Sequence, residues 1–172
     1  VDTQEIEVIR AAKSKISEVD FDNLPFGKVF SDHMLLATYE NGNWSRGSIR
    51  PYGDISVSPA MSSIHYGQSI FEGLKAYRHE DESIKTFRPF ENARRFGRSA
   101  RRLAMAEVPE ELFVASIEAL VEQDQDWVPG GRERSLYLRP FLISTEIGLG
   151  VRPADSYKYL LIASPAGAYF AG

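Results

Sequence analysis

Arginines are concentrated in one short stretch of this chain, and arginine binds anions. Five of them fall between Asn92 and Arg102, in the sequence NARRFGRSARR. At 100° per residue these arginines share one arc of a helix, opposite an apolar arc that contains Phe96 and Ala100. A solvated basic face is the simplest interpretation for most of them. A chemical role needs an anion, either the phosphates of a nucleic acid or the phosphate of a small cofactor.

The surrounding sequence disfavours nucleic acid as that anion. The formal net charge is −4, and several glutamates follow the arginines, beginning at Glu107. Nucleic acid requires a wide positive surface, whereas a small phosphate needs one well-placed guanidinium and backbone donors. Arg95 lies at the edge of the basic arc, near Asn92 and Ser99, so it is the arginine best placed to turn inward. Arg98 is the alternative.

A tyrosine and an arginine two residues apart form the second candidate group. Tyr137 and Arg139 lie in the run LYLRPF, and in a strand their side chains project from the same face. The apolar neighbours predict that Arg139 is partly buried. A buried guanidinium must be paired, because desolvating an unpaired charge costs several kcal/mol, roughly. The partner is either a carboxylate of the protein or an acidic or amino-acid ligand in a pocket.

Residues 62–78, SSIHYGQSIFEGLKAYR, form the third group. Gly67 and Gly73 mark positions where an element ends and the backbone turns or closely approaches another group. The rigid or ionisable side chains beside them are His65, Tyr66, Phe71 and Glu72. On the residues alone, a helix–loop–strand connection with aromatic side chains in the core is the simplest interpretation. A binding site is the alternative.

Alternating and β-prone runs predict the strands that position these groups, and apolar periodicity predicts two helices. The strands are expected at 33–40, 44–49, 73–78, 84–87, 135–144 and 157–164, and the helices at 89–103 and 109–127. The last two strands are nearly continuous β-prone runs and are expected to be central and covered on both faces. Residues 1–19 predict a short peripheral helix or a partly ordered arm. The order of elements indicates an α+β fold, a mostly antiparallel sheet with two main helices packed on one face.

Composition excludes several kinds of chemistry. The chain has no cysteine, so disulfides, thiolate metal sites and cysteine nucleophiles are excluded, and a reducing, cytoplasmic location fits. The three histidines show no metal-ligand spacing, so no metal site is expected. The longest apolar runs are too short to span a bilayer, and no basic-then-apolar signal peptide opens the chain. Because the chain begins at Val1 and stops just after a strand-like run, we expect it to be part of a longer protein.

Four motifs resemble segments of the branched-chain aminotransferases, which are fold-type-IV enzymes that use pyridoxal phosphate. HYGQSIFEGLKAYR is similar to HYxxxxFEGLKAxR, and NARRFGRS is similar to N-x-x-R-x-x-R-S. SLYLRPFLISTEIGLGV is similar to SLYIRPxxxxTExxLGV, and SPAGAYF is similar to SPxGxYF. The resemblance extends from about Phe26 to Gly172.

The resemblance implies a role for individual residues. Arg95 is implied as the ligand of the pyridoxal phosphate group. The implied walls of the substrate pocket are Phe71, Tyr137, Arg139 and Tyr169. Tyr66, Leu149 and Val151 are implied to reach the pocket of the neighbouring subunit, so a homodimer is expected.

The resemblance also implies a division into domains. Residues 1–24 are expected to form an N-terminal arm, 25–164 the small N-terminal domain and 165–172 the start of an interdomain linker. The family places its Schiff-base lysine and its catalytic C-terminal domain beyond Gly172. None of the six lysines, including Lys75 in FEGLKAYR, matches that lysine. The chain by itself is therefore expected to be inactive, with no catalytic residue of its own.

The function implied for the intact protein is amino transfer from leucine, isoleucine or valine to 2-oxoglutarate. A D-amino-acid aminotransferase or an aminodeoxychorismate lyase of the same fold is the alternative, although FEGLKAYR together with SLYLRP favours the branched-chain enzymes. An alternative of a different class is a non-catalytic domain that binds anions or nucleic acid through the arginine helix. Neither nucleic acid nor a membrane is expected as a partner.

Overall fold

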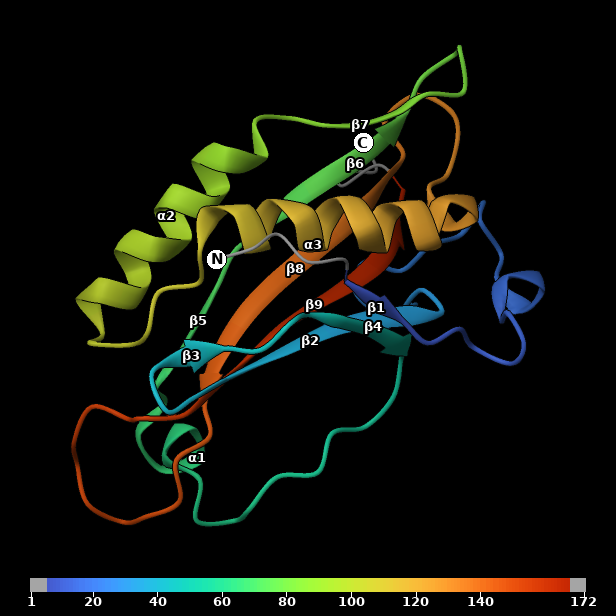
Figure 1. The fold of residues 1–172 in the computed structure, drawn as a ribbon. Coiled ribbons are helices and arrows are strands. Elements are labelled where there is room, and N and C mark those ends of the chain that lie inside the picture. Colours follow the sequence, from blue (N-terminus) through green and yellow to red (C-terminus); the bar gives the residue numbers. More distant parts are fainter. Residues whose placement is uncertain (1–5, 168–172) are drawn as a thin grey trace.

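The computed structural model describes residues 6–167, which form one curved sheet with two long helices on one face (Figure 1). The strands are β1 (Glu7–Val8), β2 (His33–Glu40), β3 (Asn43–Trp44), β4 (Ser48–Pro51), β5 (Ser69–Phe71), β6 (Leu74–Arg78), β7 (Ile84–Thr86), β8 (Ser135–Ser144) and β9 (Tyr157–Ala166). The helices are α1 (Ser62–Tyr66), α2 (Pro89–Arg102) and α3 (Glu110–Gln123), with 3-10 turns at Ile16–Glu18 and Gln125–Trp127. No helix within this part of the chain is long and apolar enough to cross a bilayer.

The sheet is mostly antiparallel, as the sequence predicted. Its strand order is β1-β4-β2-β9-β8-β6-β7, with β3 paired to β2 and β5 paired to β8. Among the strand pairs of residues 6–167, only the short β1–β4 pair is parallel. Strands from both ends of the sequence therefore meet in the centre, where β2 lies between β4 and β9.

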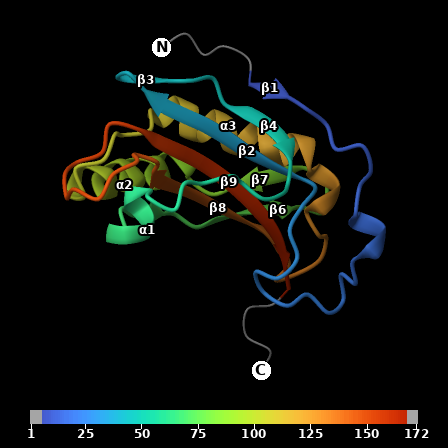
Figure 2. The ribbon, with the colours of Figure 1, turned by 90° about the horizontal axis from the view of Figure 1, so that it is seen from below.

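The core lies between the sheet and the two long helices (Figure 2). Phe96 of α2 packs 5.4 Å from Phe113 of α3 and 5.9 Å from Tyr159 of β9, measured between ring centroids. All three side chains are almost fully buried. The apolar arcs predicted for both helices thus face the sheet, and burial of this apolar surface stabilises the arrangement.

The prediction that β8 is covered on both faces is wrong. Its residues alternate along the strand, with Leu136, Leu138 and Leu142 fully buried and Tyr137 and Arg139 only half-buried. The reason is that α2 and α3 both pack on the same face of the sheet (Figure 2). The opposite face of β8 is left available to other groups.

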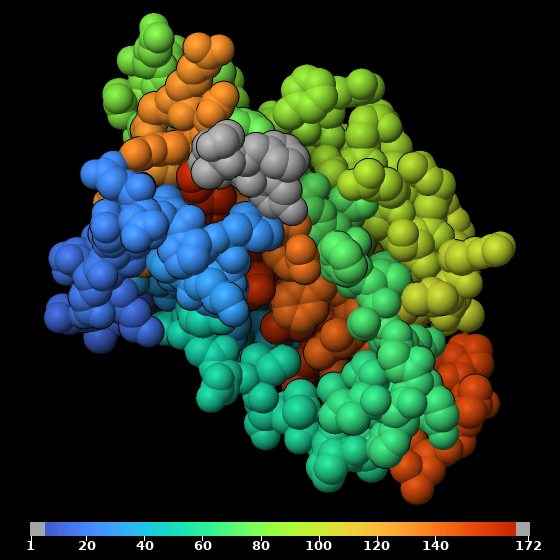
Figure 3. Space-filling view, turned by 180° about the vertical axis from the view of Figure 1, so that it is seen from behind, coloured from blue at the N-terminus to red at the C-terminus, as the bar shows by residue number. Residues whose placement is uncertain are grey.

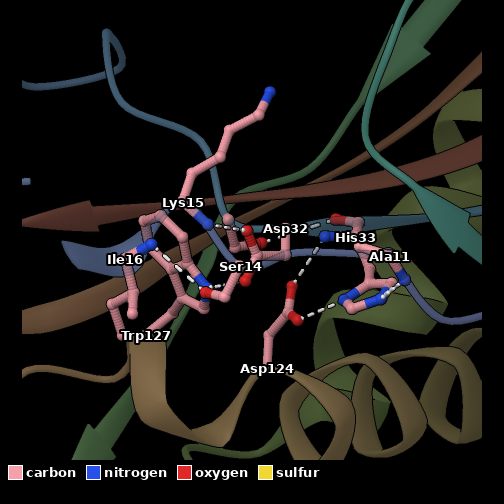
Figure 4. A network of polar contacts seen from close by, with 9 residues as sticks. Ala11, Ser14, Lys15, Ile16, Asp32, His33, Asp124 and Trp127 are labelled. Carbon is pink, nitrogen blue, oxygen red and sulfur yellow. Dashed lines mark hydrogen bonds and ion pairs between the residues drawn. The ribbon is translucent and has the colours of Figure 1, made fainter. Parts of the chain in front are cut away.

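The N-terminal arm contains no α-helix in its described part, only the 3-10 turn at Ile16–Glu18, so the peripheral helix, one of the two alternatives predicted for this segment, is wrong. Instead, backbone N–H groups of the arm bind side chains of β2 and the residue before it (Figure 4). Ala11 N donates to His33 Nε2 at 2.8 Å, and Lys15 N donates to Asp32 Oδ1 at 2.8 Å. Asp124 follows the end of α3. Its Oδ2 accepts from the backbone N–H of His33 at 3.0 Å, and its Oδ1 lies 2.6 Å from Nδ1 of the His33 ring. An extended arm leaves its N–H groups free for these bonds, which a helix would use internally.

Candidate functional site

The face of the sheet opposite α2 and α3 is hollowed (Figure 3). Atoms of β8 and β9 lie at the base of the hollow, and α2, the stretch from about residue 50 to 66, and the N-terminal segment surround it. Side chains that stand on this face of β8 therefore point into a partly enclosed space. Tyr137 and Arg139 are two of them, because their neighbours Leu136 and Leu138 point into the core.

Three consecutive residues, Phe71, Glu72 and Gly73, connect the predicted site residues. Phe71 ends β5, and Glu72 and Gly73 connect it to β6. The Glu72 N–H donates to the carbonyl oxygen of Pro140 at 2.8 Å. The ring of Phe71, the side chain of Glu72 and the backbone of Gly73 contact Arg139, Arg95 and Tyr137, respectively. The FEG motif is thus a junction between β8 and α2 rather than a plain strand connection.

Arg139 has aromatic partners instead of a carboxylate. Its guanidinium carbon lies 4.3 Å from the ring centre of Phe71 and 5.3 Å from that of Tyr137. Its Nη2 donates to the Tyr137 hydroxyl at 2.9 Å. Within residues 6–167 Arg139 forms no salt bridge, so the internal ion pair, one of its two predicted kinds of partner, is not found there. A half-buried cation with unused N–H groups on an aromatic surface is suited to bind a carboxylate.

Tyr137 contacts an aromatic ring and a glycine. The ring of Phe26 packs edge-on against it, with ring centroids 5.1 Å apart. Tyr137 also lies against Gly73, where an added Cβ would lie 3.1 Å from the Tyr137 Cζ and closer still to the hydroxyl oxygen. The glycine therefore provides space for the Tyr137 hydroxyl, which in turn accepts the hydrogen bonds from Arg139.

Arg95 is bound to Glu72. Its Nε donates to Glu72 Oε1 at 2.5 Å and its Nη2 donates to Oε2 at 2.7 Å, a two-point contact. The Glu72 side chain is only 3% exposed, whereas that of Arg95 is 61% exposed. Burial would raise the pKa of Glu72, but hydrogen bonds from Arg95, Asn92 and the Gly73 N–H outweigh burial and hold that pKa below its usual range. Glu72 is therefore a buried anion that pairs with an exposed cation.

Other arginines of α2 pair with surface glutamates. Arg94 lies 2.7 Å from Glu91, and Arg101 contacts Glu107. All four of these side chains are substantially exposed. The solvated basic face expected for most of the helix is thus present, and part of its charge is balanced on the surface. Arg98, the alternative to Arg95, is exposed and forms no salt bridge among the residues described.

Tyr66, Leu149 and Val151 form a separate group. The Tyr66 hydroxyl donates to the carbonyl oxygen of Leu149, which ties α1 to the loop between β8 and β9. The backbone N of Ser62, in the same helix, donates to the carbonyl oxygen of Glu146 at 2.9 Å. Exposed apolar side chains cover this region, namely Ile64, Tyr66, Ile147, Leu149 and Val151.

This α1–loop group does not meet the Tyr137–Arg139 group within the chain. It adjoins the end of β8 at Ser144, whereas Tyr137 lies near the start of the strand. Ser144 is seven residues beyond Tyr137 along β8, a distance of about 23 Å at 3.3 Å per residue. The apolar α1–loop group therefore faces outward at the far end of the sheet.

The remaining predicted residues have simpler surroundings. Tyr169 lies outside the described residues. His65 Nε2 lies 2.9 Å from the carbonyl oxygen of Pro59, which fits a structural role. No cluster of three or more histidine, aspartate and glutamate side chains in residues 6–167 is arranged to hold a metal ion. A second concavity, of about 1190 Å³, lies between α3 and strands β1 and β3, and none of the predicted site residues lines it.

Sequence reasoning missed two contacts of the site. Glu72 stood out only as an ionisable residue beside a glycine, without a partner. Phe26 was noted only as the start of the resemblance, and no signal linked it to Tyr137. A carboxylate between an aromatic residue and a glycine is the one clue that the sequence offered for Glu72.

The fold defines the class of protein. It matches the small domain of fold-type-IV aminotransferases, a mostly antiparallel sheet with helices on one face. The branched-chain amino acid aminotransferase of Escherichia coli superimposes with a TM-score of 0.61 over 82% of this chain and 42% of that one, at 24% identity. The enzyme of Thermoproteus uzoniensis, solved with norvaline, superimposes with a TM-score of 0.59 over 81% of this chain and 43% of that one, also at 24% identity. At this identity both likenesses show the fold alone.

A third solved structure is more similar in sequence. It is a branched-chain amino acid aminotransferase with pyridoxamine 5'-phosphate, and it superimposes with a TM-score of 0.59 at 28% identity. The match covers 78% of this chain and 41% of that one. The small-domain architecture is therefore shared with an enzyme that was solved with a phosphorylated pyridoxyl cofactor.

Curated proteins similar in sequence are branched-chain aminotransferases. The branched-chain-amino-acid aminotransferase of Mycolicibacterium smegmatis is 53% identical over 163 residues, which are 94% of this chain and 44% of the relative. Branched-chain-amino-acid transaminase 1 of Bacillus subtilis is 43% identical over 88% of this chain and 43% of the relative. No family model matches the chain.

This chain is therefore a relative of the branched-chain-amino-acid aminotransferases and corresponds to their N-terminal portion. It spans about two fifths of the length of the curated relatives it matches. The resemblance expected from the four motifs is confirmed.

Proposed function

We propose that this chain is the smaller, N-terminal domain of a branched-chain aminotransferase that uses pyridoxal phosphate. The intact enzyme transfers the amino group of leucine, isoleucine or valine to 2-oxoglutarate. Residues 25–164 form the domain, 1–24 form an arm, and 165–172 begin the linker to a catalytic domain that carries the Schiff-base lysine. The observation that supports this most strongly is the Phe71–Gly73 junction, because it contacts Arg95, Tyr137 and Arg139, which all match family motifs.

The residues present fit a cofactor phosphate. A guanidinium has five N–H donors, and Arg95 gives two of them to Glu72, so three remain for an anion. Its side chain is 61% exposed, so a phosphate can reach it. Arg95 would thus hold the phosphate by charge-assisted hydrogen bonds. When bound, pyridoxal phosphate supplies the aldehyde and the electron-withdrawing ring that amino-group transfer requires.

The substrate-binding side chains combine one cation with aromatic walls. Arg139 carries N–H groups that no carboxylate of the described residues uses, and it binds the carboxylate of an acidic substrate such as 2-oxoglutarate. Phe71, Tyr137 and Tyr169 supply rigid apolar surface for a branched aliphatic side chain. Such a side chain has no hydrogen-bonding group, so selectivity comes from shape at about 1–3 kcal/mol per methylene.

The enzyme is proposed to be a homodimer in the cytoplasm. Tyr66, Leu149 and Val151 lie at the far end of the sheet from Tyr137 and are exposed. An exposed apolar group of this kind is typical of a protein–protein contact. It completes the pocket of the neighbouring subunit, whose own Tyr137 and Arg139 form the opposite wall. A reducing location is consistent with the lack of cysteine.

An assay of the full-length protein tests this function. Leucine, 2-oxoglutarate and pyridoxal phosphate are expected to yield glutamate and the branched 2-oxo acid, with valine and isoleucine also accepted. D-alanine and aminodeoxychorismate serve as competing substrates. Preferential turnover of either of them would replace the branched-chain assignment with one of the alternatives of the same fold.

A further inference from the structure

We propose that Glu72 is the positioning residue for Arg95, setting the plane of its guanidinium so that one edge faces the cofactor phosphate. The proposal rests on the proposed function and adds a residue to which no role has been given. The two-point contact between the buried carboxylate of Glu72 and the exposed guanidinium of Arg95 is expected to raise the affinity of Arg95 for the cofactor phosphate.

The geometry of the contact decides which N–H groups are free. Glu72 occupies the Nε and Nη2 edge of the guanidinium. The edge formed by Nη1 and the second hydrogen of Nη2 remains, and it lies in the same plane because the guanidinium is rigid. Because Glu72 binds two of the three nitrogens of this rigid, planar group, it also fixes the direction in which the third nitrogen, Nη1, points. A single surface ion pair leaves that direction undefined.

Glu72 is itself held firmly enough to act as a reference point. Its Oε2 accepts from Asn92 Nδ2 at 3.0 Å, and the Gly73 N–H donates to the same oxygen at 3.2 Å. Its own N–H is bound to the carbonyl oxygen of Pro140 on β8. The carboxylate is thus anchored to the central sheet, while Arg95 extends from α2 toward solvent. Without Glu72 the long arginine side chain would sample many rotamers.

A carboxylate beside an arginine that binds phosphate also lowers the affinity for that phosphate. Its negative charge repels the phosphate and reduces the attraction of Arg95 for any anion. If Glu72 served only to pair a charge and stabilise the fold, neutralising it would tighten phosphate binding. If Glu72 positions Arg95, neutralising it weakens binding although a negative charge has been removed. The two roles therefore predict opposite signs.

The test measures the dissociation constant of pyridoxal phosphate for the full-length enzyme by absorbance or fluorescence titration, alongside thermal unfolding. Arg95→Ala is expected to raise the dissociation constant about tenfold to a hundredfold, through loss of charge-assisted hydrogen bonds. Glu72→Gln is expected to raise it about threefold to tenfold, through loss of one of the two points of contact. In the Arg95→Ala background Glu72→Gln is expected no longer to weaken binding, because only the repulsion between the carboxylate and the phosphate is then removed. Glu91→Gln and Arg94→Ala, an exposed pair on the same helix, are the matched controls and should leave it unchanged.

Arg95→Lys provides a second variant that leaves Glu72 intact, in case Glu72→Gln does not fold. It keeps the charge and loses the planar fork, so the dissociation constant is expected to rise nearly as far as in Arg95→Ala. Wild-type affinity in Arg95→Lys, or unchanged or tighter binding in folded Glu72→Gln, would overturn the positioning role. If Arg95→Ala binds like the wild type, the phosphate role of Arg95 is wrong instead, so the two failures are distinguishable.

Discussion

The hydroxyl of Tyr66 donates a hydrogen bond to the carbonyl oxygen of Leu149, 83 residues further along the chain. This bond joins α1 to the loop between β8 and β9, on which Leu149 and Val151 are 70% and 81% exposed. An apolar loop that projects into solvent needs a fixed base if it is to present one shape to a partner. Tyr66 supplies part of that base.

Tyr66→Phe should loosen the loop without unfolding the domain. The variant keeps the ring and removes one hydrogen bond, which contributes about 0.5–1.5 kcal/mol. Faster amide hydrogen exchange is expected in residues 147–151 of the chain, with little change in β8 or β9. Tyr77→Phe, which alters another partly exposed tyrosine, is the control. Exchange that rises equally throughout the sheet would contradict a local role.

Val151→Asp should impair substrate binding more than cofactor binding. In the proposed full-length dimer, the new charge enters an apolar pocket that a branched side chain must fill, and an unpaired buried charge is strongly unfavourable. The KM for leucine is expected to rise far more than cofactor occupancy falls. Steady-state kinetics and the absorbance of bound cofactor measure the two effects separately.

Mixed dimers then show whose pocket Val151 enters. A Val151→Asp subunit is combined with a subunit that lacks the catalytic lysine, which gives one doubly damaged site and one intact site if the loop crosses the interface. Recovery of a wild-type KM for leucine supports a shared site. A KM that stays high in verified heterodimers would place Val151 in the pocket of its own subunit.

The 172-residue chain alone should not transaminate. None of its lysines matches the family position, although Lys75 lies opposite Tyr137 in the β6–β8 ladder and so shares its face. Incubation with pyridoxal phosphate, leucine and 2-oxoglutarate is expected to give glutamate only at the rate of the free cofactor. Turnover that Lys75→Ala abolishes would contradict the assignment of the catalytic lysine to another domain.

Gly73→Ala should displace Tyr137. The new methyl group would lie within contact distance of the Tyr137 hydroxyl oxygen and 3.1 Å from Cζ, so the ring must shift and its bonds with Arg139 must stretch. Overpacking of this kind costs about 1–3 kcal/mol, measured as a loss in the free energy of unfolding. Gly53→Ala is the control, because a Cβ there meets no atom within 4 Å. Equal stability of the two variants would mean that Tyr137 has room to move.

Acidification should destabilise the chain through Asp32 and Glu72. Burial would raise the pKa of Asp32, but hydrogen bonds from Ser14, the Lys15 N–H and Trp127 outweigh burial and hold that pKa below its usual range. The pKa of Glu72 is also lowered. As pH falls, these carboxyl groups therefore bind protons in the unfolded chain before they do so in the folded chain. Their contribution to the free energy of unfolding is complete above the pKa of the unfolded chain, about 4, and is lost as pH falls through the lower pKa of the folded chain.

Urea unfolding between pH 6 and pH 2 checks the acid prediction. Asp32→Asn should be less stable than the wild type at neutral pH and should lose less stability on acidification. Glu111→Gln, which alters an exposed carboxylate of α3, should follow the wild-type curve. Parallel curves for Asp32→Asn and the wild type would remove Asp32 from the explanation.

Local patterns predicted most of the sheet. The bounds expected for β2 and β8 are those observed, because alternation and β-branched or aromatic content are read within a few residues. The helix expected at 109–127 ends at Gln123 and gives way to a 3-10 turn. The N-terminal arm was predicted less well, since its conformation depends on bonds to His33 and Asp32, which its own sequence does not reveal.

The site was predicted residue by residue but not as a set of contacts. Resemblance singled out Arg95, Tyr137 and Arg139. The position of Arg95 at the edge of the basic arc of the helix indicated that its side chain would turn away from the other arginines. Its partner Glu72 lies 23 residues earlier, and a pairing across that distance leaves no periodic signal. The unpaired state of Arg139 within the described residues was also unpredictable, since it depends on which carboxylates the fold brings near.

The position of β2 beside β9 has a consequence for the time course of synthesis. The ladder joins Leu35 to Leu161, so one edge of β2 has no partner until the ribosome has made roughly 120 further residues. At about 5–20 residues per second this wait lasts on the order of ten seconds. During this interval the edge of β2 that will pair with β9 is exposed. Unpaired edge strands of this kind are the sites at which strands of different chains pair. The nascent chain is therefore most vulnerable to aggregation before β9 emerges, and chaperone binding should peak in that interval.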